Sequence, residues 1–377
     1  MDKPIRVLQI IGDVVGGGVE TVIMNYYRNI DKTKIQFDFV VHKGALPQYI
    51  TKVKKHGGKV YEITSYKSNI LKYTYEIYKI IKENNYGIVH SNMNSLSGFP
   101  LLAAYLAGAK VRILHNHTTD NPAEGIRTIA KRILRPFARL FANQYWACSK
   151  LAAEWMYGEN AVTNGKVTII NNAIDLEKFK FNRKKREQLR KKLGLENCFV
   201  IGHVGRFVKT KNHEFLIEIF NEVLKQKNNA KLLLIGDGNL KSLIEAKVQN
   251  LGIEKAVIFL GVRNDVADLY NAMDVFVLPS LYEGLPVVGV EAQTNGLPFI
   301  CSDRVTNEIL LTDNIRLLSL QQYKTEWCDA ILNAERKKIA NKKDSLLKNF
   351  DIKSESKKLE ALYLSFIRRY YEKYYRK

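Results

Sequence analysis

Two glutamates flank an apolar segment in the second half of the chain. Residues 279–293 read PSLYEGLPVVGVEAQ, with Glu283 and Glu291 eight positions apart. Because an unpaired carboxylate is costly to bury, the pair either lies on a solvated face or holds a polar ligand. Pro286 suits the first turn of a helix, which puts Glu283 in the preceding loop and Glu291 on the helix. A helical segment of this length spans about 8 Å, so the carboxylates could bind opposite ends of one polyhydroxyl ligand.

A basic loop provides a second candidate site. In HVGRFVKTKN, Arg206 and Lys211 are five positions apart, just past a predicted strand. Arginine offers a planar set of donors to a phosphate group, and lysine offers a compact positive charge. The loop can therefore direct both cations at one anion, although many basic loops bind nothing.

The elements that must position these residues alternate between strands and helices. Strands are predicted at 6–12, 36–42, 58–63, 87–92, 110–117 and 144–149, with helices at 19–30, 69–84, 96–107 and 124–141. The alternation returns in the second half, with strands in CFVIGHV, KLLLIGDG, AVIFLGV, DVFVLPS and PFICSD. This order predicts an α/β protein of two Rossmann-like, doubly wound domains. Ligands of such sheets bind beyond the carboxyl ends of the strands, where both candidate sites lie.

The domain boundary is predicted in the irregular stretch at 166–182. We assign residues 1–172 to an N-terminal domain and residues 173–352 to a C-terminal domain. The basic, tyrosine-rich helix 353–377 is expected to cross back onto the N-terminal domain. Two such domains facing each other would enclose an interdomain cleft.

Charge and cysteine content narrow the classes of function. The chain has 59 Lys and Arg against 38 Asp and Glu, a net charge of +21 that attracts polyanions. A lysine-rich surface that only keeps the protein in solution would give the same excess. The four cysteines form no C-x-x-C motif, which argues against a zinc site or a disulfide framework. The first residues lack a signal-peptide pattern and no stretch is typical of a membrane span, so we expect a cytoplasmic protein.

The order of the motifs resembles a known family. A glycine-rich loop, Gly16-Gly17-Gly18, is followed by G-R-x4-K, by G-D-G, and by a strand, an E-x7-E motif and a helix. This order resembles the retaining, nucleotide-sugar-dependent glycosyltransferases of family four, which have the GT-B fold. Within that family the chain resembles enzymes of capsular and exopolysaccharide gene clusters. The resemblance covers nearly the whole chain and is most specific in the second half.

The resemblance implies roles for the charged residues. Arg206 and Lys211 match the pair that binds the donor diphosphate. Glu283 matches the glutamate beside the transferred sugar, and Glu291 matches the one that holds the ribose hydroxyls. A histidine near the sugar is also implied, for which we choose His117 in ILHNHTTD.

His115 is the alternative choice for that histidine. The remaining implied donor contacts come mostly from the backbone. Gly284 and Leu285 would contact the sugar or its phosphate. Val262 and Arg263 would border the base. The first-half loop that closes over the donor would include Gly17 and Gly18.

The implied reaction breaks a bond between a sugar and a phosphate. Negative charge builds on the leaving diphosphate, and Arg206, Lys211 and a helix N-terminus would stabilise it. The sequence has no D-x-D motif, so we predict that no metal and no other cofactor is required. The family retains the anomeric configuration. We expect a hexosyl- or N-acetylhexosaminyl-transferase that uses a UDP-sugar and an undecaprenyl-diphosphate-linked saccharide acceptor.

One helix carries a pattern suited to a membrane surface. Residues 126–141, IRTIAKRILRPFARLF, hold five Lys or Arg, no acid, and apolar residues at helical spacing. Pro136 is expected to bend or interrupt this helix. We hypothesise that Arg132, Arg135 and Arg139 hold the enzyme on the anionic inner face of the cell membrane as a peripheral protein. The alternative is an ordinary core helix with a basic outer face.

Three other functions fit parts of the pattern. A nucleic-acid-binding protein would explain the charge, but no RNA- or DNA-binding motif is present. A sugar-nucleotide epimerase could share the two-domain shape. A glycosidase could use the glutamate pair, but it would leave Arg206 and Lys211 without a phosphate to bind.

The sequence departs from the family pattern at two places. Asn212 stands where a glycine is usual, and no G-x-L-V turn follows Asp303.

Overall fold

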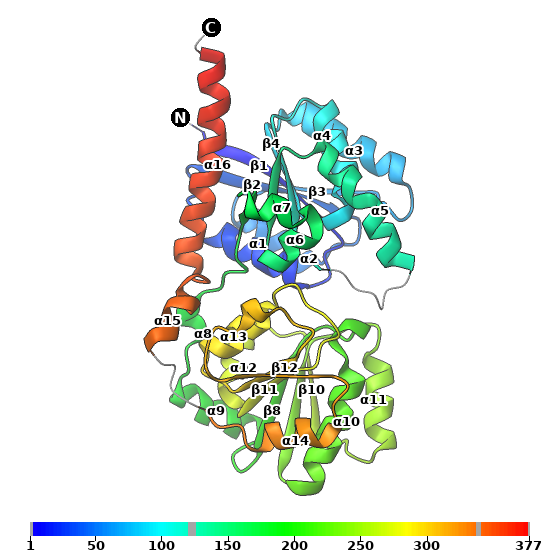
Figure 1. Cartoon of the computed structure of the whole chain (residues 1–377), viewed down its shortest axis with the longest axis vertical. Coiled ribbons are helices and arrows are strands. Elements are labelled where there is room, and N and C mark those ends of the chain that lie inside the picture. Colours follow the sequence, from blue (N-terminus) through cyan, green and yellow to red (C-terminus); the bar gives the residue numbers. More distant parts are fainter. Residues whose placement is uncertain (1–2, 120–125, 337–340, 376–377) are drawn as a thin grey trace. The chain divides into compact units, whose positions relative to one another are not determined.

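The chain folds into two compact α/β units (Figure 1). The structure is a computed structural model that describes residues 3–119, 126–336 and 341–375. The N-terminal unit comprises Met1–Ala173 together with Ile352–Lys377, and the C-terminal unit comprises Ile174–Asp351. Each unit is built on one parallel sheet, which confirms the predicted fold class.

The N-terminal unit contains a seven-stranded parallel sheet in the order β3-β2-β1-β4-β5-β6-β7. Its strands are β1 (Ile5–Gly12), β2 (Ile35–His42), β3 (Val60–Ile63), β4 (Ile88–Ser91), β5 (Val111–Asn116), β6 (Gln144–Ala147) and β7 (Val167–Ile169). Its helices are α1 (Gly18–Asn29), α2 (Pro47–Lys55), α3 (Ile70–Asn84), α4 (Gly98–Leu106), α5 (Ile126–Phe141), α6 (Lys150–Tyr157), α7 (Glu159–Thr163) and α16 (Ile352–Tyr375).

Helices cover both faces of this sheet because successive side chains of a strand point to opposite sides. Val40 of β2 packs in one cluster with Tyr73 and Ile77 of α3. Its neighbour Phe39 contacts the ring of Tyr27 in α1, with 5.5 Å between ring centroids. Helix α16 packs against α1, so the end of the chain belongs to this unit (Figure 1).

The C-terminal unit contains a six-stranded parallel sheet in the order β10-β9-β8-β11-β12-β13. Its strands are β8 (Phe199–Val204), β9 (Ala230–Ile235), β10 (Val257–Gly261), β11 (Val275–Leu278), β12 (Phe299–Ser302) and β13 (Ile315–Leu318). Its helices are α8 (Leu176–Phe179), α9 (Arg183–Leu193), α10 (His213–Gln226), α11 (Lys241–Asn250), α12 (Val266–Ala272), α13 (Val287–Thr294), α14 (Lys324–Leu332) and α15 (Asn341–Lys348).

Strand order reverses once in each sheet. In the N-terminal unit the reversal lies between β1 and β4, and in the C-terminal unit it lies between β8 and β11. Loops that leave neighbouring strands on either side of such a point diverge and leave room for a ligand. The glycine loop follows β1, and the loops with Arg206 and Glu283 follow β8 and β11. The topology thus places candidate residues at both reversal points.

Candidate active site

The loop after β8 carries Arg206 and Lys211. The Arg206 side chain is exposed, and Lys211 ends a short 3-10 turn that leads into α10. Asn212 joins the turn to α10 with a left-handed backbone, φ +55°. Glycine adopts this conformation readily and asparagine tolerates it better than most residues. The departure from the family's usual glycine is therefore compatible with the same turn.

Lys211 and Glu283 meet across the strand-order reversal of the C-terminal unit. The Lys211 ammonium donates to Glu283 Oε1, and Ser280 Oγ donates to the same oxygen at 3.0 Å. Both charged side chains are less than one-fifth exposed, at 19% and 17%. The backbone N–H of Leu281 donates to the carbonyl of Thr210 at 2.8 Å, which ties the two loops together. A lysine and a carboxylate are thereby held at one place, where a ligand with a phosphate and a hydroxyl would meet both.

A second glycine motif supports the Arg206 loop, although the sequence-based site did not include it. Gly236 and Gly238 of G-D-G have no space for a side chain. A Cβ on Gly236 would lie 2.1 Å from the carbonyl oxygen of Gly205, and one on Gly238 would lie 2.6 Å from that of Phe207. Phe207 N–H also donates to the carbonyl of Asp237 at 3.0 Å. A G-D-G motif directly after a buried strand was the signal that could have identified this support.

Replacing Gly236 with alanine should therefore destabilise the C-terminal unit. The clash with a backbone atom and the strained backbone at φ +139° together cost about 3 kcal/mol of unfolding free energy. Gly252→Ala is the matched control, because Gly252 has φ +66° but no described residue places an atom within 4 Å of the added carbon. This change should cost about 1 kcal/mol. Urea unfolding of the full chain measures both. Equal losses would contradict the role of the close contact.

Glu291 lies on α13 and is buried, whereas Glu283 precedes the helix as expected. Pro286 immediately precedes α13 instead of standing in its first turn. The Glu291 side chain is only 7% exposed, and Tyr270 OH donates to its Oε2 at 2.9 Å. Burial raises the pKa of Glu291 to about 7, because a charged carboxylate loses its hydration there. Gly284 and Leu285, between the two glutamates, are also buried.

The residues predicted to border the base lie at the end of β10. Val262 is 65% exposed. Arg263 forms a two-pronged ion pair with Asp265, with Nε to Oδ1 at 2.8 Å and Nη2 to Oδ2 at 2.7 Å. The Arg263 side chain is therefore already engaged with Asp265.

In the N-terminal unit, the glycine loop begins α1. Gly17 caps the helix without a side-chain hydrogen bond, and Gly18 is its first residue. The buried carboxylate of Glu20 lies against this loop. Its Oε1 accepts from the N–H of Val15 at 3.0 Å, and a Cβ on Gly17 would lie 2.7 Å from its Oε2. Within the described ranges of the chain, no atom lies within 4 Å of where a Cβ on Gly18 would stand.

The two candidate histidines at the end of β5 differ in burial and in hydrogen-bond partner. His115 is buried and its Nδ1 lies 3.0 Å from Nε2 of His90. His117 is partly exposed, and its Nε2 lies 2.9 Å from Oδ1 of Asn92. Burial of the ring lowers the pKa of His117 to about 3. Of the two histidines, only His117 is partly exposed, while His115 is buried.

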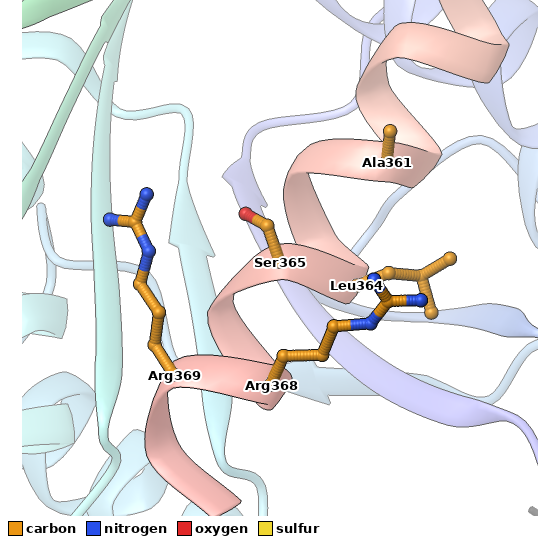
Figure 2. A pocket seen from close by; sticks show the side chains of 5 residues that line it. All are labelled: Ala361, Leu364, Ser365, Arg368 and Arg369. Carbon is orange, nitrogen blue, oxygen red and sulfur yellow. The ribbon is translucent and has the colours of Figure 1, made fainter. Parts of the chain in front are cut away.

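Two hollows of the N-terminal unit lack the features of a substrate site. A cavity of about 20 Å³ lies among side chains that include Gln9, His90 and His117, which is room for one water molecule. A groove on α16 is lined by Ala361, Leu364, Ser365, Arg368 and Arg369. Figure 2 shows the two guanidinium groups of that groove pointing to different sides of the helix, so they do not converge on one anion.

The helix predicted to face a membrane presents a mixed surface. Helix α5 runs to Phe141 without a break at Pro136, which corrects one of the two expected effects of that proline, an interruption. Ile129, Ile133 and Leu140 are 57%, 69% and 72% exposed. Arg132 and Arg139 are exposed as well.

Arg135 points elsewhere. Its guanidinium lies over the ring of Trp155 and donates to the Trp155 carbonyl.

Among the described residues, no group of three or more His, Cys, Asp or Glu could hold a metal ion. No helix in the same part of the chain is long and apolar enough to span a membrane.

Comparison with known proteins gives consistent matches. The family model "Glycosyltransferase Family 4" matches residues 16–178, and "Glycosyl transferases group 1" matches residues 185–349. EpsF of Bacillus subtilis, named as a glycosyltransferase, is 35% identical over 87% of each chain. A UDP-Gal:alpha-D-GlcNAc-diphosphoundecaprenol alpha-1,3-galactosyltransferase of Escherichia coli is 29% identical over 77% of this chain and 78% of that one. Anabaena HepE, solved with UDP-glucose, has a TM-score of 0.79 at 20% identity, covering 96% of this chain and 99% of that one.

Proposed function

The chain belongs to the family-four glycosyltransferases with the GT-B fold, and from this premise we propose that it adds one sugar from a UDP-sugar to a growing capsular or exopolysaccharide glycan. The observation that carries the proposal is the meeting of Lys211 and Glu283 at the strand-order reversal of the C-terminal unit, with Arg206 on the same loop as Lys211. The relatives and family models are glycosyltransferases, so neither an epimerase nor a nucleic-acid-binding protein is favoured.

In this proposal the C-terminal unit binds the donor. Arg206 and Lys211 hold the diphosphate, and Lys211 exchanges part of its interaction with Glu283 for the phosphate oxygens. Glu283 is then available to a hydroxyl of the transferred sugar, and Glu291 accepts hydrogen bonds from the ribose hydroxyls.

The remaining donor contacts in this proposal come from two other stretches of the C-terminal unit. Backbone groups of Gly284 and Leu285 lie beside the sugar or its phosphate, and Val262 and Arg263 border the base.

The bond that breaks joins the sugar to the diphosphate. Positive charge grows on the sugar while the leaving diphosphate takes the bonding electrons. The acceptor hydroxyl bonds to the sugar from the same face, and its proton passes to the leaving diphosphate. The positive charges of Arg206 and Lys211 stabilise the charge that develops on the leaving diphosphate, and they thereby lower the barrier. We propose that these cations serve in place of a metal ion. His117 contacts the transferred sugar, and the glycine loop with Gly17 and Gly18 closes over the donor.

The acceptor in this proposal is an undecaprenyl-diphosphate-linked saccharide bound by the N-terminal unit. Support comes from the Escherichia coli relative, whose name specifies a diphosphoundecaprenol-linked acceptor for that enzyme. The transferred sugar is a hexose or an N-acetylhexosamine.

An assay in EDTA tests the function directly. UDP release from one UDP-sugar should depend on the lipid-linked acceptor and disappear in Lys211→Ala. Conversion of the UDP-sugar to another without any acceptor would instead indicate an epimerase.

We further propose that α5 brings the protein to the anionic inner surface of the cell membrane. Its exposed Ile129, Ile133 and Leu140 would enter the interface, while Arg132 and Arg139 would contact anionic headgroups. Arg135 is omitted from this surface because it is engaged with Trp155.

The double variant Ile133→Ser/Leu140→Ser should bind anionic vesicles about tenfold more weakly, since two apolar side chains no longer leave water. Vesicle sedimentation with phosphatidylglycerol measures the change. Leu243→Ser is the matched control, because Leu243 is 52% exposed on α11 of the C-terminal unit. Unchanged binding of the double variant would exclude α5 as the membrane-binding element.

A further inference from the structure

A buried hydrogen-bond network connects the last helix of the chain to His117. Tyr363 of α16 is fully buried, and its hydroxyl lies 3.1 Å from Gln9 Nε2 and 2.7 Å from His90 Nδ1. From Gln9 the network continues through Asn92 to His117. All these residues belong to the N-terminal unit.

Donors and acceptors give one arm of the network a direction. Gln9 Nε2 can only donate, so it donates to the oxygen of Tyr363. The tyrosine proton is then directed at Nδ1 of His90, which must be unprotonated. His90 therefore carries its proton on Nε2 and donates to His115 Nδ1 at 3.0 Å. This arm ends at His115 Nε2, which is buried and has no partner in the described part of the chain.

The other arm determines the proton position on His117. Asn92 Nδ2 donates to Gln9 Oε1 at 3.0 Å and lies 3.5 Å from the carbonyl oxygen of His90. Both of these oxygens are acceptors, so the amide nitrogen of Asn92 faces them. Asn92 Oδ1 then faces His117 Nε2 at 2.9 Å and can only accept. His117 thus carries its proton on Nε2 and keeps the lone pair on Nδ1.

The opposite direction is chemically possible and would reverse the chemistry of His117. If the amides of Gln9 and Asn92 both turned over, Asn92 would donate to His117 Nε2, and the proton would move to Nδ1. One feature opposes this state. The amide oxygen of Asn92 would face the His90 carbonyl, and the two acceptors would repel each other.

We propose that Tyr363 is a positioning residue that, through Gln9 and Asn92, holds His117 in the Nε2–H tautomer with Nδ1 free to accept a hydrogen bond. An unprotonated Nδ1 would accept a hydrogen bond from a hydroxyl group of the ligand. That part of the inference rests on the proposed function, in which His117 contacts the transferred sugar. The tautomer itself follows from the network alone.

Removing the Tyr363 hydroxyl should reverse the direction of the hydrogen bonds in the arm that runs through Gln9 and Asn92 to His117. In Tyr363→Phe, Gln9 Nε2 would face a ring that cannot accept, and a buried unpaired N–H is worse tolerated than an unpaired carbonyl. Gln9 should therefore turn its Nε2 to Asn92, and Asn92 should turn its own Nδ2 to His117. The expected result is a shift of His117 to the Nδ1–H tautomer and a fall in kcat of about tenfold with little change in the KM for the donor.

Nitrogen-15 NMR of the full chain, labelled at histidine, reads the tautomers directly. The wild-type spectrum should show His117 neutral and protonated at Nε2 at neutral pH. A wild-type Nδ1–H form, or a spectrum of His117 unchanged by Tyr363→Phe, would overturn the proposal. Tyr73→Phe is the matched control, since Tyr73 is also buried and its hydroxyl has no hydrogen-bond partner among the residues that the structure describes.

Turnover separates this inference from the proposed function. A tautomer shift with the tenfold loss of kcat supports both the network and the sugar contact. A tautomer shift with unchanged kcat would overturn the sugar contact of His117. A wild-type protein that transfers no sugar would refute the proposed function, while the NMR result on Tyr363 would stand by itself.

Discussion

Arg206→Ala should lower kcat by roughly 10²- to 10³-fold while donor affinity changes much less. Removing one preorganised group that stabilises charge in a transition state typically has an effect of this size. Arg206 is exposed and forms no ion pair with any described residue, so its charge is available to a ligand. Its contribution should be largest when the leaving diphosphate gains charge, which occurs during bond breaking and only partly in the ground state.

Steady-state kinetics at saturating acceptor, combined with calorimetric titration of UDP, separate the two effects. Lys209→Ala is the matched control, because Lys209 is an exposed cation of the same loop to which we assign no role. It should change kcat by less than about threefold, as expected for a solvated charge. An Arg206→Ala enzyme with near-wild-type kcat would remove Arg206 from the reaction.

The second large effect is expected at Glu291, in the pH dependence of stability. The folded-state pKa is raised to about 7, above the ordinary value of 4.5, so the folded protein holds a proton that the unfolded chain releases. The stability from this proton is fully present below about pH 4.5 and is lost as the pH rises through 7. The total loss is about 3 kcal/mol at most. Glu291→Gln should abolish this slope and make the protein more stable than wild type at pH 8.

The affinity for nucleotide should also depend on the ionisation of Glu291, but it should rise with pH where the stability falls. Ribose hydroxyls donate hydrogen bonds, so they favour the ionised carboxylate, and UDP affinity should rise between about pH 6 and pH 8. Glu291→Ala should weaken UDP binding by about 10- to 100-fold, in line with the loss of charge-assisted hydrogen bonds. Glu254→Gln, an exposed glutamate of the same unit, is the control. A wild-type affinity that does not vary with pH would contradict the ribose contact.

Local sequence patterns predicted most of the fold because strands and helices differ in hydrophobic period. Buried runs such as 6–12 and 36–42 correspond to β1 and β2 within one residue at each end. Helix α2 was missed because it is short and polar, although Pro47 in its first turn was a usable signal. Strand β13 was missed as well, since it lies at the sheet edge and has a mixed, partly exposed pattern.

The site could be predicted only in part from the sequence. Motif order and the rule for doubly wound sheets placed Arg206, Lys211 and Glu283 at strand ends. The pairing of Lys211 with Glu283 joins residues 72 positions apart, so only the strand order reveals it. The burial of Glu291 against Tyr270 likewise depends on how α12 and α13 pack. Tyr363 lies 273 positions from His90, and no local pattern connects the two.

The central claim is that the C-terminal unit binds a nucleotide through Arg206, Lys211 and Glu291 without a metal ion. A thermal-shift panel in EDTA with UDP, GDP, ADP and several UDP-sugars tests it most directly, because a ligand that binds the folded state raises the melting temperature. We expect stabilisation by UDP and by one UDP-sugar above the others, and loss of both shifts in Glu291→Ala. No shift with any nucleotide, together with salt-sensitive binding to an oligonucleotide, would contradict the account.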